Sequence, residues 1–237
     1  MRQRPQSCAS RKSDSLVAVT GSADTLRISE IFYSLQGEST RIGLPTVFVR
    51  LTGCPLRCTW CDTEYAYSGG SEMTLDGVME SVSRIGGDCK TVCVTGGEPL
   101  AQQACLPFLT ALCDADYSVS LETSGAFDIS GVDSRVAKIM DLKAPSSGEA
   151  DRNRWINLAS LTPHDEIKCV LASAADYAWA KAVLKEKNLD KLCPVLFSPV
   201  SGQLEPGQLA EWILRDRLPV RFQMQLHKLL WGSERRK

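Results

Sequence analysis

Short buried strand patterns alternate with helical patterns along this chain, and that alternation restricts its possible folds more than any other feature. The β-branched and apolar strand patterns occupy residues 46–51, 91–95, 117–122, 136–142, 166–171, 194–200 and 220–225. The helical patterns occupy residues 75–85, 101–114, 174–187 and 206–215. Strands that alternate with helices form a parallel sheet in which the helices are the crossover connections. We therefore predict an α/β fold with six or seven strands, arranged as an open sheet or a partial barrel.

The first helical pattern carries its own start and stop signals. Thr74 precedes apolar residues at the spacing of one helix face, and threonine is a favoured N-cap residue. Gly86 and Gly87 follow the last apolar residue, where glycine commonly ends a helix. We predict that this helix begins after Thr74 and ends at the glycine pair.

Polar or glycine-rich turns follow four of the predicted strands. These turns are Gly53-Cys54, Gly96-Gly97-Glu98-Pro99, Glu122-Thr123-Ser124-Gly125 and Lys143. In α/β folds, ligands bind where the strands end and the loops begin. The four turns therefore predict one composite site on one rim of the sheet.

Composition and charge exclude several classes of protein. The 237 residues include 27 lysines and arginines against 28 acidic residues, so the charge nearly cancels and gives no reason to expect nucleic-acid or anionic-membrane binding. No apolar run approaches the roughly 18 residues that cross a bilayer. Ten cysteines without a signal peptide indicate a reducing compartment, and we expect a cytoplasmic protein in which some cysteines are ligands.

The first 25 residues differ from the rest of the chain. They contain four basic residues, several serines and only a short apolar patch, Leu16–Val19. A signal peptide needs an apolar region of about 7–15 residues, so this segment is not one. We predict that residues 1–25 are a disordered tail or are absent from the protein made in the cell, and that residues 26–237 form a single domain.

Three cysteines form the strongest chemical signal. Cys54, Cys58 and Cys61 lie within eight residues in the string Cys-Pro-Leu-Arg-Cys-Thr-Trp-Cys. Thiolates are the ligands of zinc and of iron–sulfur clusters, and a loop of this spacing can wrap one metal centre. Cys93 and Cys169 lie in apolar strand patterns, where a free cysteine behaves as a small buried hydrophobic residue.

A structural zinc is the sharper rival to a cluster. Such a zinc normally takes four ligands, often from two pairs of residues. No second pair is near the triad, and His164 and His227 are isolated. Three thiols without a fourth ligand favour a cubane cluster with one open iron, and a zinc-binding interaction module remains the alternative.

The triad directly after the first strand pattern resembles the signature of the radical S-adenosylmethionine (SAM) superfamily. In that superfamily the open iron of a [4Fe–4S] cluster binds the amino and carboxylate groups of SAM. Gly96-Gly97-Glu98-Pro99 resembles the second signature of the superfamily, whose backbone approaches the SAM amino group. A carboxylate such as that of Glu98 is also able to accept hydrogen bonds from an ammonium.

Further strings resemble the 7-carboxy-7-deazaguanine synthases, a family of short radical SAM enzymes. They are Glu30-Ile31-Phe32, Leu35-Gln36-Gly37-Glu38, Phe48-Val49-Arg50, Cys61-Asp62-Thr63, Glu122-Thr123-Ser124-Gly125, Gln225-Leu226-His227 and Leu230-Trp231-Gly232. The resemblance covers residues 26–237. It implies a partial, modified (β/α) barrel of about six parallel strands and a homodimer. It also implies ring contraction of 6-carboxy-5,6,7,8-tetrahydropterin to 7-carboxy-7-deazaguanine with release of ammonia, a lyase reaction of queuosine biosynthesis. The implied electron donor is a protein such as a flavodoxin.

The resemblance also implies a set of site residues. The cluster ligands are Cys54, Cys58 and Cys61, and the Mg2+ ligand is Thr63. SAM binds Trp60, Cys61, Asp62, Gly97, Asp141, Leu142 and Lys143. The pterin binds Leu35, Gln36, Gly37, Arg50, Thr95 and His227.

Two of these assignments agree with the chemistry of the side chains. Arg50 offers a fork of donors that matches the substrate carboxylate, and Gln36 offers both a donor and an acceptor to a ring edge. Two positions depart from the family pattern, since Ser39 replaces a usual glycine and Asp141-Leu142-Lys143 replaces the frequent Ser-Pro-Lys. Another radical SAM enzyme, such as a glycyl-radical activase, remains the alternative within the superfamily. An activase needs a protein-docking surface and no pterin clamp.

Overall fold

A nine-stranded sheet organises the part of the chain described by the computed structural model, which comprises residues 24–232, 234 and 236. The strands are β1 (Thr25–Leu35), β2 (Pro45–Leu51), β3 (Ser71–Thr74), β4 (Thr91–Gly96), β5 (Ser118–Thr123), β6 (Ala137–Asp141), β7 (Glu166–Leu171), β8 (Val195–Pro199) and β9 (Arg221–Phe222). Their order is β3-β1-β2-β4-β5-β6-β7-β8-β9. The seven strands from β2 to β9, without β3, run parallel, whereas β1 pairs antiparallel with both β2 and β3.

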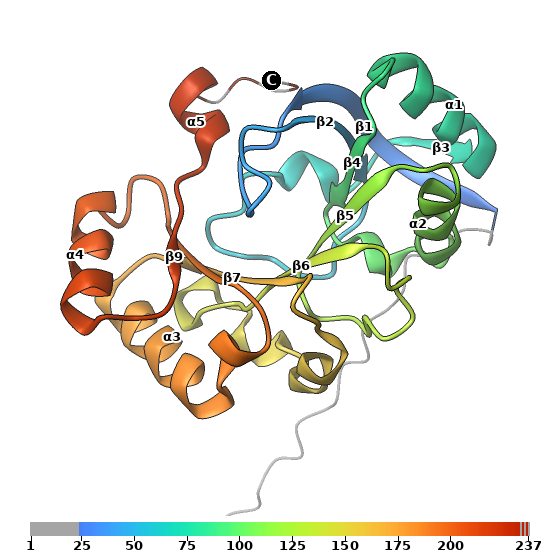
Figure 1. Cartoon of the computed structure of the whole chain (residues 1–237). Helices are drawn as coiled ribbons and strands as arrows, with labels where there is room; N and C mark the ends of the chain where they lie inside the picture. The colour runs from blue at the N-terminus through green and yellow to red at the C-terminus, as the bar shows by residue number, and fades with distance from the viewer. Residues whose placement is uncertain (1–23, 233, 235, 237) are drawn as a thin grey trace, which may run out of the picture.

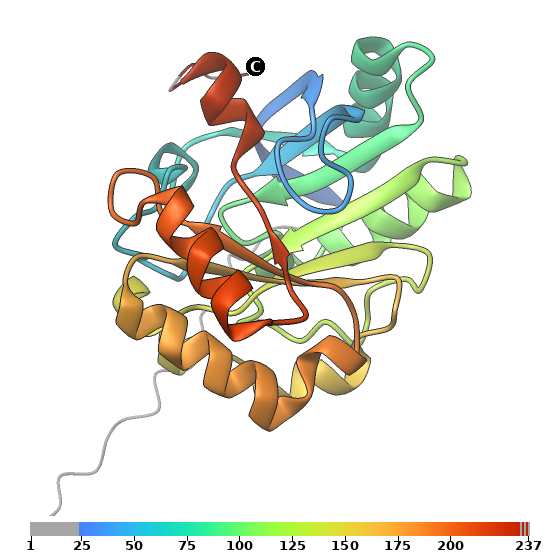
Figure 2. The same ribbon diagram turned by 60° about the vertical axis from the view of Figure 1, so that its left-hand side comes forward.

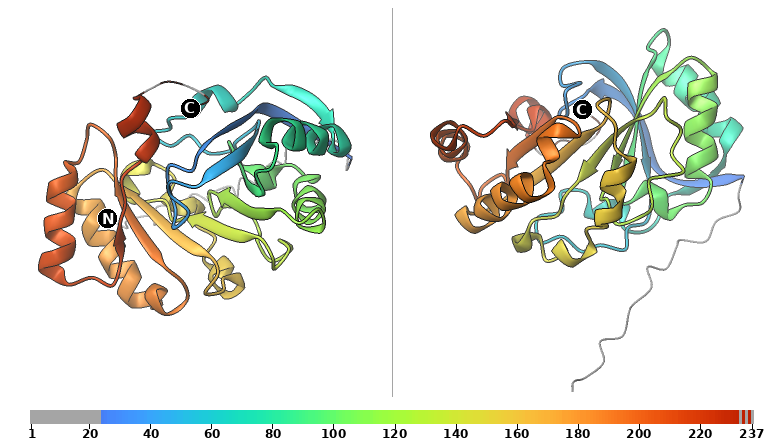
Figure 3. Two further views of the ribbon diagram at one scale, coloured as in Figure 1. Left: turned by 45° about the horizontal axis from the view of Figure 1, so that its top comes forward. Right: turned by 60° about the horizontal axis from the view of Figure 1, so that its bottom comes forward.

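Four helices cover the outer face of the curved sheet (Figure 1, Figure 3). They are α1 (Leu75–Gly86), α2 (Cys105–Asp114), α3 (Ala174–Lys187) and α4 (Pro206–Asp216). A fifth helix, α5 (Leu226–Trp231), stands apart from them near the end of the chain (Figure 2). Short 3-10 helices occupy Glu64–Ala66, Pro99–Ala101, Pro145–Ser147, Ala150–Arg152, Trp155–Ser160 and Leu189–Lys191. The hydrophobic core fills the space between the sheet and the outer helices.

Local sequence signals explain where the helices begin and end. Thr74 caps α1, because its hydroxyl accepts a hydrogen bond from the Gly77 N–H at 3.1 Å. Ser173 caps α3 in the same way through the N–H of Asp176. Asn188 ends α3 in the left-handed conformation, which asparagine tolerates better than most residues. The predicted limits of the first helix are thus confirmed to within one residue.

The loop after the antiparallel strand β1 enters the inside of the curved sheet. It enters from the end of the sheet opposite to the predicted turns at the strand ends. The loop joins β1 to β2 and spans residues 36–44. Because β2 runs parallel to the later strands, this loop lies at their amino ends. The loop that carries Cys54, Cys58 and Cys61, which we call the cysteine loop, follows the carboxyl end of β2. The two loops therefore approach the inside of the curved sheet from opposite sides (Figure 1).

The predicted fold class is confirmed, since the sheet is mostly parallel, curved and not closed. It has seven parallel strands where about six were expected, and the antiparallel strands β1 and β3 were not predicted. The predicted helix at 101–114 starts later, at Cys105, after a 3-10 turn. The predicted tail lies outside the described residues except for residues 24 and 25, and Thr25 already belongs to β1. No helix among the described residues has the length and apolarity needed to cross a membrane.

Candidate functional site

A cavity of about 950 Å³ lies on the inner side of the sheet. All sixteen residues that the sequence marks as site residues line it. They are Leu35, Gln36, Gly37, Arg50, Cys54, Cys58, Trp60, Cys61, Asp62, Thr63, Thr95, Gly97, Asp141, Leu142, Lys143 and His227. The fold thus brings residues of β1, β2, β4 and β6, of the cysteine loop, of the loop of residues 36–44 and of α5 to one place.

The three cysteines of the triad differ from the other described cysteines in their exposure. Cys54, Cys58 and Cys61 are partly exposed at the cavity wall, whereas five of the other six described cysteines are buried. Burial raises the pKa of the Cys54 thiol to about 11, while the nearby Lys143 ammonium opposes this rise. The free thiol is therefore protonated at neutral pH, and a metal would bind by displacing that proton.

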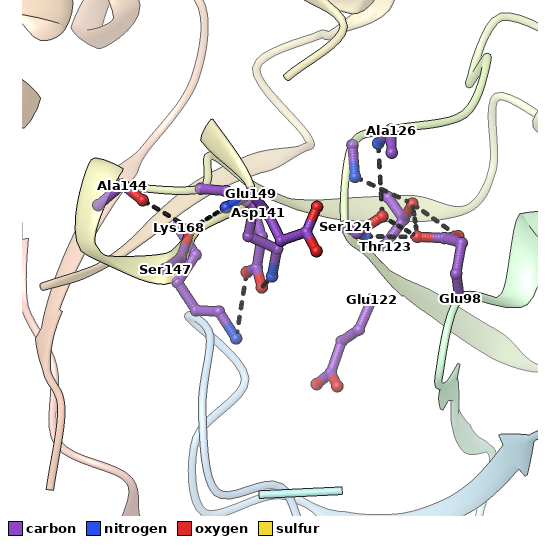
Figure 4. Close-up of polar contacts among 12 residues, drawn as sticks. Glu98, Glu122, Thr123, Ser124, Ala126, Asp141, Ala144, Ser147, Glu149 and Lys168 are labelled. Atoms are coloured by element: carbon purple, nitrogen blue, oxygen red, sulfur yellow. Dashed lines mark hydrogen bonds and ion pairs between the residues drawn. The ribbon is translucent and has the colours of Figure 1, made fainter. Parts of the chain in front are cut away.

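Backbone contacts hold the cysteine loop in place. The Arg57 guanidinium donates to the carbonyls of Cys54 and Leu56, both at 2.7 Å. The Thr59 N–H donates to the Ser147 carbonyl at 3.1 Å, and the Ser147 hydroxyl in turn accepts from the Glu149 N–H (Figure 4). The loop conformation is thus fixed by residues other than the thiols themselves, which leaves the thiols available as ligands.

The donor set fits a cluster better than a single ion. Among the residues that the structure describes, no three histidine, cysteine or acidic side chains converge closely enough to hold one metal ion. Each thiolate of a cubane binds a different iron atom, so cluster cysteines stand apart around a common centre. The converging ligands of a structural zinc are not formed by the triad.

The Gly96-Gly97-Glu98-Pro99 turn packs tightly against the start of the cysteine loop. A Cβ atom on Gly97 would lie 2.3 Å from the Gly53 carbonyl oxygen and 2.8 Å from the Cys54 Cβ. Only glycine permits this approach, because backbone atoms cannot give way. The turn therefore presents bare backbone beside the triad, which is the surface that an amino acid ligand requires.

Glu98 does not face the cavity, and the expectation that its carboxylate meets an ammonium is wrong. Its side chain is fully buried and accepts hydrogen bonds from the N–H groups of Leu100 and Ser124 at 3.0 and 2.6 Å. Both hydroxyls of Thr123 and Ser124 donate to it as well (Figure 4). Burial raises the pKa of Glu98, and these hydrogen bonds oppose the rise. The residue is a structural clamp between two turns.

We expect Glu98→Gln to destabilise the protein by about 1–3 kcal/mol. Each carboxylate oxygen faces a backbone N–H, so the amide NH2 of glutamine must meet a donor on one side or the other. Denaturant unfolding measures the loss. Glu211→Gln, at an exposed position of α4, is the matched control and should stay within about 0.5 kcal/mol of the parent. Equal stability of the two variants would contradict the clamp.

Arg50 is held at the cavity wall by an acidic partner that the sequence did not reveal. Its Nε donates to Glu30 Oε1 at 2.9 Å, and the Tyr65 hydroxyl donates to the same oxygen at 2.8 Å. The Arg50 side chain is 16% exposed. Its Nη groups have no hydrogen-bond partner among the described residues. Nε thus orients the guanidinium, and its terminal fork is available to a ligand.

Glu122 is a second acidic residue of the cavity; it belongs to one of the four turns predicted to form the site, although the sequence assigned it no ligand. Gln36 Nε2 donates to Glu122 Oε1 at 3.3 Å, and Thr95 Oγ1 donates to Oε2 at 2.8 Å. Its carboxylate points away from the buried Glu98 cluster (Figure 4). A glutamate at the end of an apolar strand was the signal that marks it, since strand ends line the site in this fold.

Ser39, which stands where a glycine was expected, adopts a glycine-like conformation in the loop of residues 36–44. Its φ of 66° lies in the left-handed region that favours glycine. Gln223 holds it there, because its amide accepts from the Ser39 N–H at 3.0 Å and donates to the Ser39 carbonyl at 2.9 Å. The serine is thus fixed in a conformation that its side chain disfavours.

His227, near the other end of the sequence, contacts the loop of residues 36–44. The Leu226 N–H donates to the Gly37 carbonyl at 2.9 Å. A Cβ on Gly37 would lie 2.2 Å from His227 Nδ1, so the imidazole packs directly on this glycine. The structure therefore brings Gly37 and His227 together at the cavity wall.

Acidic and basic side chains alternate along the remaining wall. Asp141 Oδ2 lies 2.7 Å from Lys143 Nζ, and its Oδ1 lies 3.3 Å from Lys168 Nζ. Burial alone would lower the pKa of Lys168, but the carboxylates of Asp141 and Glu38 hold it well above its ordinary value. Lys168 was missed from the sequence, although a lysine inside an apolar strand is an unusual feature.

Asp62 and Thr63 lie side by side after the third cysteine. Thr63 Oγ1 donates to Asp62 Oδ1 at 2.9 Å, and Lys228 Nζ lies 3.0 Å from Asp62 Oδ2. Both residues line the cavity, and α5 supplies the lysine. Oxygen atoms of the kind that Mg2+ prefers thus gather next to the triad.

Comparison with known proteins agrees with this geometry. The model of the Radical SAM superfamily matches residues 48–186. A 7-carboxy-7-deazaguanine synthase from Chlorobaculum tepidum is 50% identical over 214 residues, which cover 89% of this chain and 96% of that protein. A second one, from Koribacter versatilis, is 43% identical over 225 residues and covers 88% of this chain and 98% of its own.

A solved structure has the same fold. The crystal structure of QueE from Escherichia coli matches with a TM-score of 0.68 at 24% identity, and the match covers 86% of this chain and 95% of that one. Sequence motifs, fold and relatives thus agree. The chain belongs to the radical SAM superfamily and, within it, to the family of 7-carboxy-7-deazaguanine synthases.

Proposed function

We propose that this chain converts 6-carboxy-5,6,7,8-tetrahydropterin to 7-carboxy-7-deazaguanine with release of ammonia. The observation that carries the proposal is the joint lining of one cavity by the cysteine triad and by the paired residues Arg50–Glu30 and Gln36–Glu122. An electron-transfer centre and a polar clamp for a small carboxylated ring system are thus adjacent. The names of the relatives support the same reaction.

The triad would hold a [4Fe–4S] cluster, and SAM would bind beside it. When bound, this pair supplies the radical chemistry of the reaction. The bare backbone at Gly97 faces the SAM amino group in this proposal. Trp60, Asp62 and the Asp141-Leu142-Lys143 segment form the rest of the SAM site. All of these residues line the same cavity as the triad.

The pterin would bind on the other side of the cavity. The free fork of Arg50 would bind the substrate carboxylate, because a guanidinium matches a carboxylate with two parallel hydrogen bonds. Gln36 and Thr95, which already contact Glu122, would meet the polar edge of the ring together with the carboxylate of Glu122. Leu35, Gly37 and His227 would close the site. A closed site protects a reactive radical from water and from unintended C–H bonds.

We expect Thr63→Ala to slow turnover and to reduce stimulation by Mg2+ while leaving the visible spectrum of the cluster unchanged. The hydroxyl is a neutral oxygen ligand, and Mg2+ often takes only one or two ligands from protein. Thr63→Ser restores the oxygen and should recover most of the loss. Initial rates over a range of Mg2+ concentrations measure both effects. A Thr63→Ala variant with the Mg2+ response of the parent would place the metal elsewhere.

Three further features belong to the proposal. A small acidic electron carrier such as a flavodoxin would reduce the cluster. The protein would act as a homodimer. It would work in the cytoplasm, where thiols stay reduced.

The direct test is an anaerobic assay of the reconstituted protein with SAM, dithionite and the carboxylated tetrahydropterin. We expect formation of 7-carboxy-7-deazaguanine and ammonia in equal amounts. Broad visible absorption of the protein before the assay confirms that an iron–sulfur cluster is present, whereas zinc would leave it colourless. SAM cleavage without pterin conversion would favour another radical SAM activity, such as activation of a protein partner.

A further inference from the structure

Lys168 occupies a position between the two halves of the cavity. It lies inside β7, and its side chain is 11% exposed and lines the cavity. Its Nζ is 2.5 Å from Glu38 Oε2. It is 3.3 Å from Asp141 Oδ1, a contact that Figure 4 shows. Glu38 belongs to the loop of residues 36–44, which we call the pterin loop, at the amino ends of the strands, and Asp141 ends β6 at the carboxyl ends. One ammonium thus joins groups that enter the site from opposite sides.

The contacts continue outward from both carboxylates. Asp141 Oδ2 pairs with Lys143 Nζ at 2.7 Å, and the Leu142 N–H donates to the Lys168 carbonyl at 2.8 Å. On the other side, Gln225 Nε2 donates to Glu38 Oε1 at 2.6 Å. A continuous chain of polar contacts therefore runs from the Asp141-Leu142-Lys143 segment through Lys168 to the pterin loop.

The charged side chains in this chain of polar contacts balance one another and are largely buried. The ammonium groups of Lys143 and Lys168 match the carboxylates of Asp141 and Glu38. Removal of one partner from a buried ion pair leaves an uncompensated charge, which is strongly unfavourable. The four side chains therefore hold one another in place, and a ligand that fixes one of them also reduces the cost of ordering the others.

We propose that Lys168 is a positioning residue that couples the binding of SAM to the binding of the pterin. This inference rests on the proposed function, since it assigns the Asp141 end of the chain of polar contacts to SAM and the Glu38 end to the pterin. SAM that orders Asp141 and Lys143 fixes the Lys168 ammonium, which then holds Glu38 and the neighbouring Gln36 and Gly37 in their binding positions. Thermodynamic linkage requires the pterin to tighten SAM binding by the same factor.

Equilibrium titrations of the reconstituted enzyme test the coupling. The cluster is kept oxidised under anaerobic conditions, so that SAM is not cleaved. The dissociation constant of 6-carboxy-5,6,7,8-tetrahydropterin is measured with and without saturating SAM, and that of SAM with and without the pterin. We expect each ligand to tighten the other by on the order of tenfold in the parent enzyme. Lys168→Met should bring both ratios to within about twofold of one, because it removes the ammonium and keeps much of the side-chain volume.

Lys138→Met is the matched control. Lys138 is a buried lysine of β6 that pairs with Asp165 at 3.1 Å, and it does not line the cavity. Its replacement disturbs a buried ion pair of the same kind, yet the ratios should stay at the parental value. If Lys168→Met does not fold, Asp141→Ser removes the adjoining carboxylate and should reduce the ratios as well.

The outcomes separate this inference from the proposed function. Parental ratios in Lys168→Met, or in Asp141→Ser, overturn the coupling role. A parent enzyme in which neither ligand changes the dissociation constant of the other overturns it too, while the proposed function stands. A parent enzyme that binds SAM but no pterin overturns the proposed function, and the coupling with it.

Discussion

Cys58→Ala is expected to lose the iron–sulfur cluster and to show no detectable SAM cleavage. The triad supplies three thiolates to one cluster, and no other described cysteine lines the cavity. A cubane with only two protein thiolates lacks a ligand for one further iron, so it is lost or rearranged. Iron analysis, the visible spectrum and the yield of 5′-deoxyadenosine measure the effect. The same result is expected for Cys54→Ala and Cys61→Ala.

Two other cysteines provide controls for the triad. Cys89 is partly exposed but lies outside the cavity, so Cys89→Ala should keep iron, spectrum and activity. Cys93 is buried in β4, and Cys93→Ala should keep the cluster while losing about 1 kcal/mol of stability to a small cavity. Full iron content and activity in Cys58→Ala would remove that residue from the ligand set.

The second large effect is expected at Arg50. Arg50→Lys keeps the positive charge but loses the planar fork, and we expect the affinity for the pterin to fall by roughly 30-fold or more. Arg50→Ala should fall further, because it also removes the arginine that pairs with Oε1 of the nearly buried Glu30, which then keeps Arg236 on Oε2. Binding titrations and the KM for the pterin measure the loss, while SAM affinity should change little.

Arg27 offers a control for this substitution. It lies on β1, where it pairs with Glu72 of β3, and it does not line the cavity. Arg27→Lys should therefore leave pterin affinity at the parental value. Unchanged affinity in both Arg50 variants would show that another group binds the substrate carboxylate.

The sequence patterns predicted those strands and helices whose signals lie among a few neighbouring residues. The strand patterns at 46–51 and 166–171 and the helix after Thr74 agree with β2, β7 and α1 to within one residue. The strand β3 has four residues and no apolar run, so its pairing with β1 decides its structure. The short sequence of β3 therefore did not predict this strand.

The same distinction separates the site residues that were predicted from those that were missed. The triad and the Gly97 turn are contiguous strings, so their chemistry can be predicted from neighbouring residues in the sequence. Glu30 and Lys168 are single charged residues whose partners lie 20 and 130 positions away in sequence. Their roles depend on strand register and on the path of the pterin loop, neither of which a hydrophobic pattern specifies. Glu98 shows the opposite case. Its motif is readable in the sequence, but the structure buries the Glu98 carboxylate away from the cavity.

The contacts of residues 225–228 have a consequence for the order in which the site is made. Gln225 holds Glu38, Leu226 holds Gly37 and Lys228 holds Asp62, and 163 residues separate Asp62 from Gln225. A ribosome that adds about 5–20 residues per second takes on the order of 10–30 s to cover that distance. During this interval the pterin loop lacks the contacts that residues 225–228 supply, although Arg57 and Ser147 already contact the cysteine loop. The cavity is therefore completed only after residues 225–228 have been made.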